Sequence, residues 1–394
     1  MLPAYYEFQN PVKIISGRKA LENLPYELDQ WGARKPLIVT DPGVVRAGLV
    51  KQVIQAFAGS GLTIGGVFDQ VPPDSSKKTV NETAQAFRRG GCDSMIAVGG
   101  GSVIDTAKAA NILVSEGVDD LTPFVGSDLL KRPLKPLVVI PTTSGTGSEV
   151  TVAAVIADPE KNVKLAFTSR YLLPNLAILD PRMTLTLPGP ITAATAMDAL
   201  THSMEAFLCI QKNPLSDAYA WAAIRLIVSN LLRVIRDGKD VEGRLALANA
   251  SCMAGVAFCN SMVGVVHALG HACGGVCAIP HGVMMNIFLP HGLRYNLNRT
   301  GSQVGELLLP LAGPEVFAGT PEERRPERTI EAVVQLRDEL HRLTGLPRTL
   351  KEAGVSREKF PEIALKSLGD GSMVFNPEEV DYEDALELLN RAWE

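Results

Sequence analysis

The sequence predicts a doubly wound α/β domain followed by a mainly helical domain. Short β-branched runs alternate with helical stretches up to about residue 185, whereas strand-like runs become scarce beyond that point. A chain of 394 residues is also long for a single hydrophobic core. We therefore expect an α/β domain over residues 1–187 and a helical domain over residues 188–394.

Three units in which a strand runs into a glycine-containing turn lie in the first half of the chain. Residues 35–43, KPLIVTDPG, are typical of a buried strand that ends in a turn, and a helical stretch follows them. Residues 94–102, SMIAVGGGS, form a second unit that runs into the helical VIDTAKAANILVS. Residues 135–150, KPLVVIPTTSGTGSEV, form a third. Strands that alternate with helices predict a mostly parallel sheet.

The second half consists of long helical stretches separated by turns. One of them is ITAATAMDALTHSMEAFLCI, and the last is YEDALELLNRAW, for which Asp381 is the predicted N-cap. Residues 262–290 are apolar enough to resemble a membrane helix, but histidines, glycines and two prolines interrupt them. We expect this segment to be buried in the protein core.

The composition argues against several classes of partner. Hydrophobic residues make up 46% of the chain, charged residues make up 21%, and the formal net charge is -5. Such a chain lacks the basic face that a nucleic acid or an anionic membrane would require. Residues 1–17 show no signal-peptide pattern, and the six cysteines include no C-x-x-C pair. We expect a cytoplasmic protein with reduced thiols.

Two loops rich in glycine and hydroxyl side chains follow the second and third predicted strands. In GGGSVIDTAK the glycines let the backbone approach a phosphate, and the next helix presents its free N–H groups. A tight turn without a ligand is the alternative here, because the G-x-G-x-x-G spacing is missing. Since ligands bind at the carboxyl ends of parallel strands, the two loops together predict a nucleotide site. Its candidate residues are Gly99, Gly100, Gly101, Ser102, Thr142, Thr143 and Thr146.

Two charged residues can contribute to the same site. Asp41 closes the first strand, and a carboxylate there can hydrogen-bond a ribose diol and repel a 2′-phosphate, which favours NAD over NADP. Asp41 can equally be a turn-initiating residue before Pro42. Lys164 can add a positive charge, or it can be an ordinary solvated lysine.

Three of the six histidines lie in the uncharged stretch VVHALGHACGGVCAIPHG. His267 and His271 are four residues apart, and His281 follows a turn on a loop that can fold back. Asp198 and His202 have the same spacing, which places both side chains on one face of a helix. One aspartate with two or three histidines predicts a Zn²⁺ or Fe²⁺ site, the alternative being histidines that are satisfied within the core.

A metal beside a dinucleotide indicates hydride chemistry. A Lewis acid can lower the pKa of an alcohol hydroxyl from ~16 to ~7, so that the proton is lost before the hydride leaves. In the reverse direction the metal polarises a carbonyl, and a nearby histidine can relay the proton to solvent. The residues therefore predict an oxidoreductase acting on alcohols or aldehydes.

The motifs GGGSVIDTAK, PTTSGTGSEV, MDALTHSMEAF, HALGH and IPHGVMMNIFLPH, in this order, resemble the iron-containing (group III) alcohol dehydrogenase family. The resemblance implies a dehydroquinate-synthase-like α/β domain that binds the dinucleotide and an all-α C-terminal domain, with the site in the cleft between them. It implies an NAD-dependent alcohol dehydrogenase or aldehyde reductase acting on small primary alcohols, with Fe²⁺ or alternatively Zn²⁺. It also implies a homodimer or a higher homo-oligomer.

The resemblance assigns roles to individual residues. The metal ligands would be Asp198, His202, His267 and His281, and His271 would be a proton relay that does not bind the metal. The residues implied to bind or flank the cofactor are Asp41, Gly99, Gly100, Gly101, Ser102, Asp105, Thr142, Thr143, Thr146 and Lys164.

One departure from the family pattern concerns the substrate. Between His271 and His281 the chain reads ACGGVCAI, where the family usually has PLG followed by bulkier residues. We expect the smaller Val276 and Cys277 to admit a larger or branched alcohol.

Two other functions remain as alternatives. A zinc polyol dehydrogenase of the glycerol type shares the fold, but the HALGH…IPHG spacing fits it less well. A metal-dependent phosphoester hydrolase would need an acid/base carboxylate beside the metal. It would also leave Asp41 and both glycine loops without a role.

Overall fold

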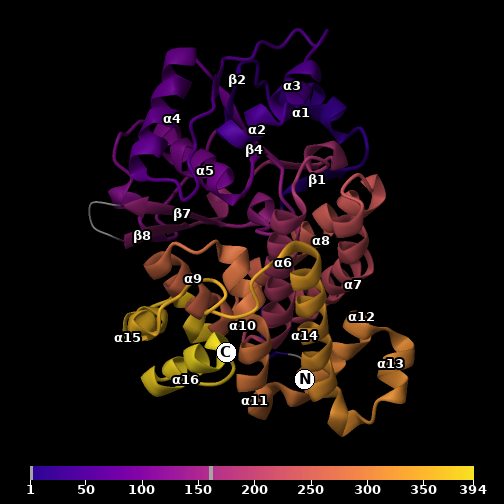
Figure 1. Cartoon of the computed structure of the whole chain (residues 1–394). Coiled ribbons are helices and arrows are strands. Elements are labelled where there is room, and N and C mark those ends of the chain that lie inside the picture. The colour runs from indigo at the N-terminus through magenta and orange to yellow at the C-terminus, as the bar shows by residue number, and fades with distance from the viewer. Residues whose placement is uncertain (1–2, 159–162) are drawn as a thin grey trace. The chain divides into compact units, whose positions relative to one another are not determined.

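The computed structural model describes residues 3–158 and 163–394, which form two compact units (Figure 1). One unit comprises residues 10–187 and contains a parallel sheet. The other comprises residues 188–394 together with the N-terminal segment that ends at Gln9, and it is helical. The predicted fold class is confirmed.

The N-terminal segment packs with the helical unit, although the predicted α/β domain began at residue 1. Phe8 stacks against Tyr219 with the ring centroids 5.8 Å apart. The N–H of Gln9 donates to Asn260 Oδ1 at 2.7 Å, and Asn260 Nδ2 donates to the carbonyl of Gln9 at 3.0 Å. These contacts join residues that are far apart in the chain, 251 positions for Gln9 and Asn260, so no local pattern in the sequence indicates them.

The α/β unit is built on a six-stranded parallel sheet with the order β1-β9-β6-β4-β2-β3. Its strands are β1 (Lys13–Ser16), β2 (Pro36–Thr40), β3 (Gly66–Phe68), β4 (Ser94–Gly99), β6 (Leu137–Pro141) and β9 (Leu176–Leu179). Its α-helices are α1 (Leu24–Gln30), α2 (Pro42–Arg46), α3 (Leu49–Gln55), α4 (Lys77–Gly90) and α5 (Gly101–Glu116). The three predicted strand-then-glycine units begin with β2, β4 and β6. An α-helix follows β2 and β4, whereas only a short 3-10 helix, Ser148–Val150, follows β6 before the next strand.

A smaller sheet has the order β5-β8-β7. Its strands are β5 (Gly126–Ser127), β7 (Ala153–Asp158) and β8 (Val163–Thr168). Strands β7 and β8 pair antiparallel, a feature that the sequence analysis did not anticipate.

Alternate residues of the central strands face opposite layers of helices. Leu37 and Val39 of β2 belong to the apolar cluster that includes α4 and α5, which lie side by side in Figure 1. Ile38, between them, belongs to the cluster that includes α1 and α3. Because helices cover both faces of the sheet, the strands are apolar throughout rather than alternating.

The carboxyl ends of β2, β4 and β6 are neighbours in the sheet. The register pairs Thr40 with Val98 and Gly99 with Pro141, so the loops after these strands lie next to one another. The strand order also reverses here, because β3 lies on one side of β2 and β4 lies on the other. Open α/β sheets bind ligands at such a switch point.

The helical unit has one apolar core to which most of its helices contribute. Its helices are α6 (Gly189–Leu208), α7 (Pro214–Arg236), α8 (Val241–Cys259), α9 (Val265–Cys277), α10 (His281–Tyr295), α11 (Leu297–Glu306), α12 (Leu308–Ala312), α13 (Pro314–Gly319), α14 (Arg325–Thr344), α15 (Phe360–Leu368) and α16 (Tyr382–Trp393). Asp381 caps α16, as predicted.

One helix of this unit, α7, is long and apolar enough by length and composition to cross a membrane. It packs against α6 and α8, and its buried apolar residues belong to the apolar core, although only 33% of its most apolar stretch is buried. The segment singled out from the sequence, residues 262–290, is instead divided between α9 and α10.

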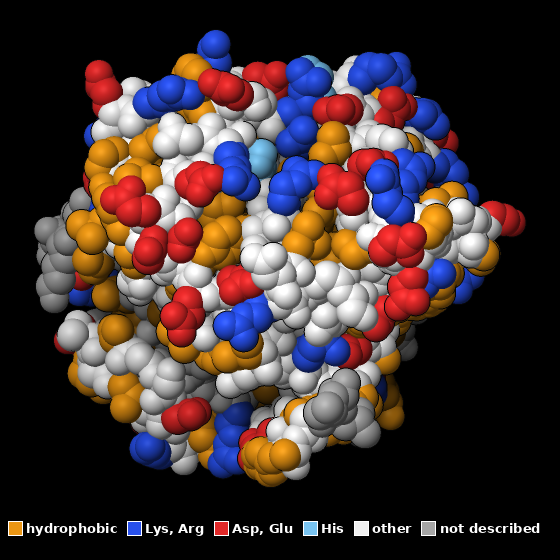
Figure 2. Space-filling view, turned by 90° about the horizontal axis from the view of Figure 1, so that it is seen from below, with side chains coloured by type: hydrophobic (Ala, Val, Ile, Leu, Met, Phe, Trp, Pro, Cys, Tyr) orange, Lys and Arg blue, Asp and Glu red, His pale blue; other side chains and the backbone are white. Residues whose placement is uncertain are grey.

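Charged side chains of both signs are interspersed on the face of the molecule shown in Figure 2. Pairs such as Arg236–Glu339 and Arg348–Glu352, both 2.9 Å, occur in the helical unit. Water screens exposed pairs of this kind, so they contribute little to stability. Apolar burial therefore holds the helices together.

A buried lysine ties α5 to the segment that follows the third loop. Lys108 is fully buried, and its Nζ donates to the carbonyls of Thr151 and Ala153 at 2.7 and 2.9 Å. We expect Lys108→Met to lower the free energy of unfolding by about 2–4 kcal/mol, because buried carbonyls lose their donor. Chemical denaturation measures this loss. The exposed Lys78→Met is the matched control, and equal stabilities for both variants would contradict the structural role of Lys108.

Candidate metal centre

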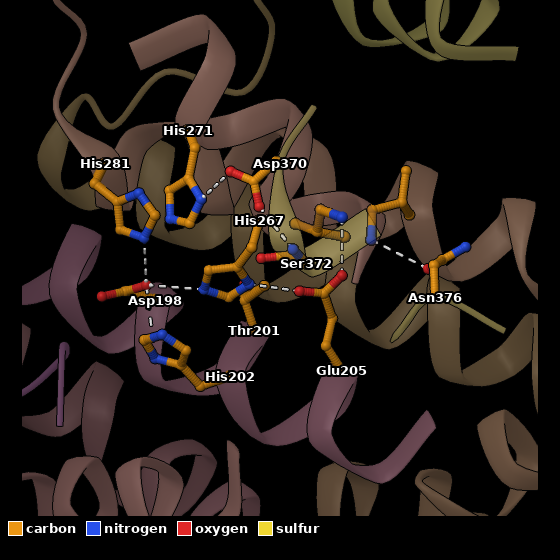
Figure 3. Close-up of polar contacts among 12 residues, drawn as sticks. Asp198, Thr201, His202, Glu205, His267, His271, His281, Asp370, Ser372 and Asn376 are labelled. Carbon is orange, nitrogen blue, oxygen red and sulfur yellow. Dashed lines mark hydrogen bonds and ion pairs between the residues drawn. The ribbon is translucent and has the colours of Figure 1, made fainter. Parts of the chain in front are cut away.

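Three helices of the helical unit bring the four predicted metal ligands together (Figure 3). Asp198 and His202 lie one turn apart on α6, His267 lies near the start of α9, and His281 is the first residue of α10. One ligand atom from each residue lies within 4.8 Å of the others. The cluster therefore joins positions up to 83 residues apart, 198 and 281, at one point.

The turn between α9 and α10 directs His281 back towards the cluster. Ala278 ends α9 in the left-handed region, with φ 54°, and Pro280 precedes α10. His281 was predicted on a loop but instead begins a helix. A Cβ atom on Gly282 would lie 2.4 Å from the carbonyl oxygen of Ala194, so only glycine permits this close contact between α10 and α6.

Asp198 lies at the centre of the cluster. Its Oδ1 is 3.2 Å from His281 Nε2, 3.7 Å from His202 Nδ1 and 3.8 Å from His267 Nε2. The side chains of Asp198, His202 and His267 are 2–7% exposed, whereas that of His281 is 37% exposed. The site is thus enclosed by protein and open beside His281.

The charged groups of the cluster shift one another's pKa values. Burial alone would raise the pKa of Asp198, but His202, His281 and His267 outweigh it and hold the pKa well below its usual value. Burial alone would lower the pKa of His267, but its interactions with Asp198 and Glu205 raise it to about 9. The carboxylate therefore stays ionised and requires a positive partner.

The residues fit a divalent metal. Among the described residues, the buried Asp198 Oδ1 and His267 Nε2 have no hydrogen-bond partner. One carboxylate oxygen and three imidazole nitrogens are donors that suit Fe²⁺ and Zn²⁺. A cation at this point would give both buried atoms a ligand contact.

His271 lies beside the four-residue cluster and is not part of it. Its ring stacks on His281 with centroids 5.1 Å apart, and its side chain is 45% exposed. Its Nδ1 is 2.9 Å from Asp370 Oδ2, and Asp370 Oδ1 accepts a hydrogen bond from the N–H of Ser372 at 2.8 Å. Burial opposes ionisation of Asp370, but the bonds from His271 and Ser372 outweigh it and lower the pKa of that carboxyl.

Sequence reasoning missed two carboxylates that contact these histidines, Glu205 and Asp370. Glu205 follows Asp198 by seven residues and His202 by three, so helical spacing alone could have placed it on the same face of α6. Asp370 is 99 residues from His271 and has no comparable signal.

In the α/β unit, the two predicted nucleotide loops pack against each other. A Cβ atom on Gly100 would lie 3.3 Å from Thr143 Oγ1, and one on Gly101 would lie 3.1 Å from Thr146 Cγ2. The N–H of Thr142 donates to the carbonyl of Gly99 at 3.1 Å. Gly101 begins α5, a helix of 16 residues, so the loops surround a helix N-terminus at the switch point.

The polar side chains around these loops already make contacts within the protein. Asp41 Oδ1 caps α2 by accepting from the N–H groups of Gly43 and Val44 at 2.7 and 2.9 Å. Ser102 Oγ accepts from the N–H of Asp74 at 3.3 Å, and Lys164 Nζ is 2.8 Å from Asp74 Oδ1.

Asp105 contacts the backbone of the smaller sheet. Its Oδ2 accepts a hydrogen bond from the N–H of Val155 on β7 at 3.1 Å. Burial raises its pKa to about 6, although Lys108 and the bond from Val155 act in the opposite direction. Asp105 therefore helps to fasten α5 to β7.

The two residues expected to widen the substrate site, Val276 and Cys277, lie at the end of α9. Both are partly buried and pack against the apolar core of the helical unit.

Family models match both units of the chain. The model for iron-containing alcohol dehydrogenases matches residues 11–181, and the C-terminal model of the Fe-containing alcohol dehydrogenase family matches residues 192–393.

Individual relatives match almost end to end. An NAD-dependent methanol dehydrogenase of Bacillus methanolicus is 34% identical over 388 residues, covering 98% of this chain and 99% of the relative. A 1,3-propanediol dehydrogenase of Citrobacter freundii is 36% identical, with 92% of each chain covered. The solved structure of an alcohol dehydrogenase from Oenococcus oeni has a TM-score of 0.93 and 32% identity, covering 99% of this chain and 100% of that one. The chain belongs to the iron-containing alcohol dehydrogenase family.

Proposed function

We propose that this chain oxidises small primary alcohols and reduces the corresponding aldehydes with NAD, using a divalent metal for which Fe²⁺ is the first candidate and Zn²⁺ the second. The reaction class, alcohol dehydrogenase or aldehyde reductase, follows from the family. The proposed ligands are Asp198, His202, His267 and His281. The observation that carries this proposal is the convergence of these four side chains at a buried point where Asp198 Oδ1 and His267 Nε2 lack hydrogen-bond partners among the described residues.

The residues around the cluster have separate proposed roles in the reaction. When bound, the metal supplies Lewis acidity towards the substrate oxygen, and NAD supplies the hydride acceptor or donor. The three buried ligands exclude water from one side, and the exposed flank at His281 admits the substrate. His271 contacts both His281 and solvent, and Asp370 holds its Nδ1, so its Nε2 can carry a proton between the site and water.

The α/β unit supports the choice of a dinucleotide. The loops with Gly99, Gly100 and Gly101 and with Thr142, Thr143 and Thr146 lie together at the carboxyl edge of the sheet. The N-terminus of α5 offers N–H groups to a pyrophosphate, with Ser102 in its first turn. Asp41 is proposed to bind the ribose, whereas Asp105 and Lys164 are proposed to flank the cofactor.

Location and assembly belong to the same proposal. We expect the protein in the cytoplasm, where the six cysteines of this chain, which include no C-x-x-C pair, would stay reduced. We expect a homodimer or a higher homo-oligomer, as the family resemblance implies. The smaller side chains Val276 and Cys277 stay an expectation about substrate size.

The central test is the metal dependence of NADH oxidation with short aldehydes. Metal-stripped protein, kept anaerobic, should be inactive, and added Fe²⁺ or Zn²⁺ should restore the loss of absorbance at 340 nm. His267→Ala should lower kcat/KM by more than about 100-fold, because one proposed ligand is lost. Rates that ignore the metal would reject the four residues as a catalytic centre.

Metal binding should release protons. In the metal-free protein the pKa of His267 is raised to about 9, so at neutral pH its imidazole must lose a proton before it can bind a cation. The apparent affinity for Zn²⁺ should therefore rise by about tenfold per pH unit between pH 6.5 and 8. Calorimetry in two buffers of different ionisation enthalpy gives the number of protons. Binding without proton release would show that His267 is neutral in the metal-free site.

Asp41→Asn should shift the cofactor preference. The amide oxygen can still accept from Gly43 and Val44, so α2 keeps its cap, while the charge that repels a 2′-phosphate is removed. We expect the ratio of kcat/KM for NADH to that for NADPH to fall about tenfold or more. An unchanged thermal midpoint is the control. An unchanged ratio would mean that Asp41 acts only as a helix cap.

A further inference from the structure

Glu205 connects α6 to the start of α9. It lies on α6 one turn after His202, and it is 4% exposed. Its Oε1 accepts a hydrogen bond from the N–H of Val266 at 2.8 Å, and its Oε2 lies 2.5 Å from His267 Nδ1 (Figure 3). One buried carboxylate thus contacts both the backbone and the first histidine of α9.

The start of α9 depends on side chains that come from elsewhere in the chain. Its N-cap is Gly264, which has no side chain to cap the helix. Glu205 accepts from Val266, and Asn376 Oδ1 accepts from the N–H of Val265 at 3.1 Å. A Cβ atom on Gly264 would lie 2.6 Å from Asn376 Oδ1, so glycine is needed for these caps to reach the helix. A carboxylate at this position also suits the positive end of the helix dipole.

The contact with His267 determines which ring nitrogen faces Asp198. Oε1 of Glu205 accepts from the N–H of Val266, and when Oε2 accepts in the same way from the ring beside it, Nδ1 of His267 carries hydrogen. With Nδ1 committed to Glu205, it is Nε2 that lies 3.8 Å from Asp198 Oδ1 and that has no hydrogen-bond partner within residues 3–158 and 163–394. The proton that His267 loses when a metal binds would therefore be the one on Nε2, and the lone pair left there would point at the centre of the cluster.

We propose that Glu205 is a positioning residue that holds His267 in the form protonated at Nδ1 and so presents Nε2 to the metal. The inference rests on the metal site of the proposed function. Metal-binding histidines commonly donate their other ring N–H to a carboxylate, which fixes the ring and its tautomer. Here the same carboxylate also caps α9, so the position of the helix and the protonation of its histidine are set together.

Glu205→Gln separates this role from helix capping. If the amide oxygen of the glutamine stays with the N–H of Val266, its NH₂ group faces His267 Nδ1 and favours hydrogen on Nε2. In the reverse orientation the NH₂ group faces the N–H of Val266. When a metal occupies Nε2, hydrogen must stay on Nδ1, so either orientation of the glutamine leaves one hydrogen bond unmade. In the metal-free form, hydrogen can move to Nε2, and Nδ1 can then accept a hydrogen bond from the amide.

The test is the Zn²⁺ affinity of each variant, measured by competition with a chelator, together with the thermal midpoint of the metal-free protein. We expect Glu205→Gln to weaken Zn²⁺ binding by about 10–100-fold and to change the metal-free midpoint by less than about 3 °C. Asn376→Ala is the matched control, since Asn376 caps the same helix without touching a histidine. It should lower the midpoint and change the affinity by less than about threefold.

The outcomes separate the two proposals. A wild-type chain that binds no divalent metal would overturn the metal site and the role of Glu205 together. Wild-type binding with equal affinity in Glu205→Gln would overturn the role of Glu205 alone. If the variant does not fold, ¹⁵N-histidine spectra of the zinc-loaded wild type replace it. A hydrogen on Nδ1 of His267 supports the proposal, and coordination through Nδ1 rejects it.

Discussion

The burial of the Asp198 carboxylate among three imidazole rings is the constraint on which the helical unit depends. An unpaired charge in a protein core is costly, so positive partners have to be brought to it from other helices. His202 is on the same helix as Asp198, whereas α9 and α10 bring His267 and His281 to it. Glycines stand where these helices approach most closely. Gly282 permits the contact between α10 and α6, and Gly264 lets two side chains reach the start of α9. Glycine at these two positions thus allows charged groups from distant parts of the chain to come together.

The α/β unit also contains a buried charge that needs partners, in this case the amino group of a lysine. Lys108 is a fully buried cation whose amino group is surrounded by carbonyl oxygens near the start of β7. Asp105, one turn earlier on α5, accepts from the backbone of β7. Together they fasten the helix that presents its N-terminus at the switch point to the strand that follows the threonine loop. Polar groups inside this unit therefore fix the geometry of the loops, while apolar layers hold the sheet.

Local patterns predicted the central strands and the pair on α6 correctly, because strand periodicity and a four-residue helical spacing are properties of neighbouring residues. Long-range features were not accessible in this way. The packing of Phe8 on Tyr219 and the contact of Asp370 with His271 join distant segments, and nothing near either residue indicates its partner. Glu205 is an intermediate case. Its helical spacing from His202 can be read from the sequence, but its bond to His267 depends on where α9 begins.

The charge balance of the cluster explains why a divalent cation fits it best. Asp198 and Glu205 place two buried carboxylates on either side of His267, one near each ring nitrogen. The interactions with both carboxylates raise the pKa of His267 to about 9, so the space between them favours positive charge. A divalent cation beside three neutral imidazoles would compensate both carboxylates, whereas a monovalent ion would only match the proton that it displaces. The proposed role of Glu205 therefore depends on its position beside His267 as well as on its hydrogen bond to the backbone of α9.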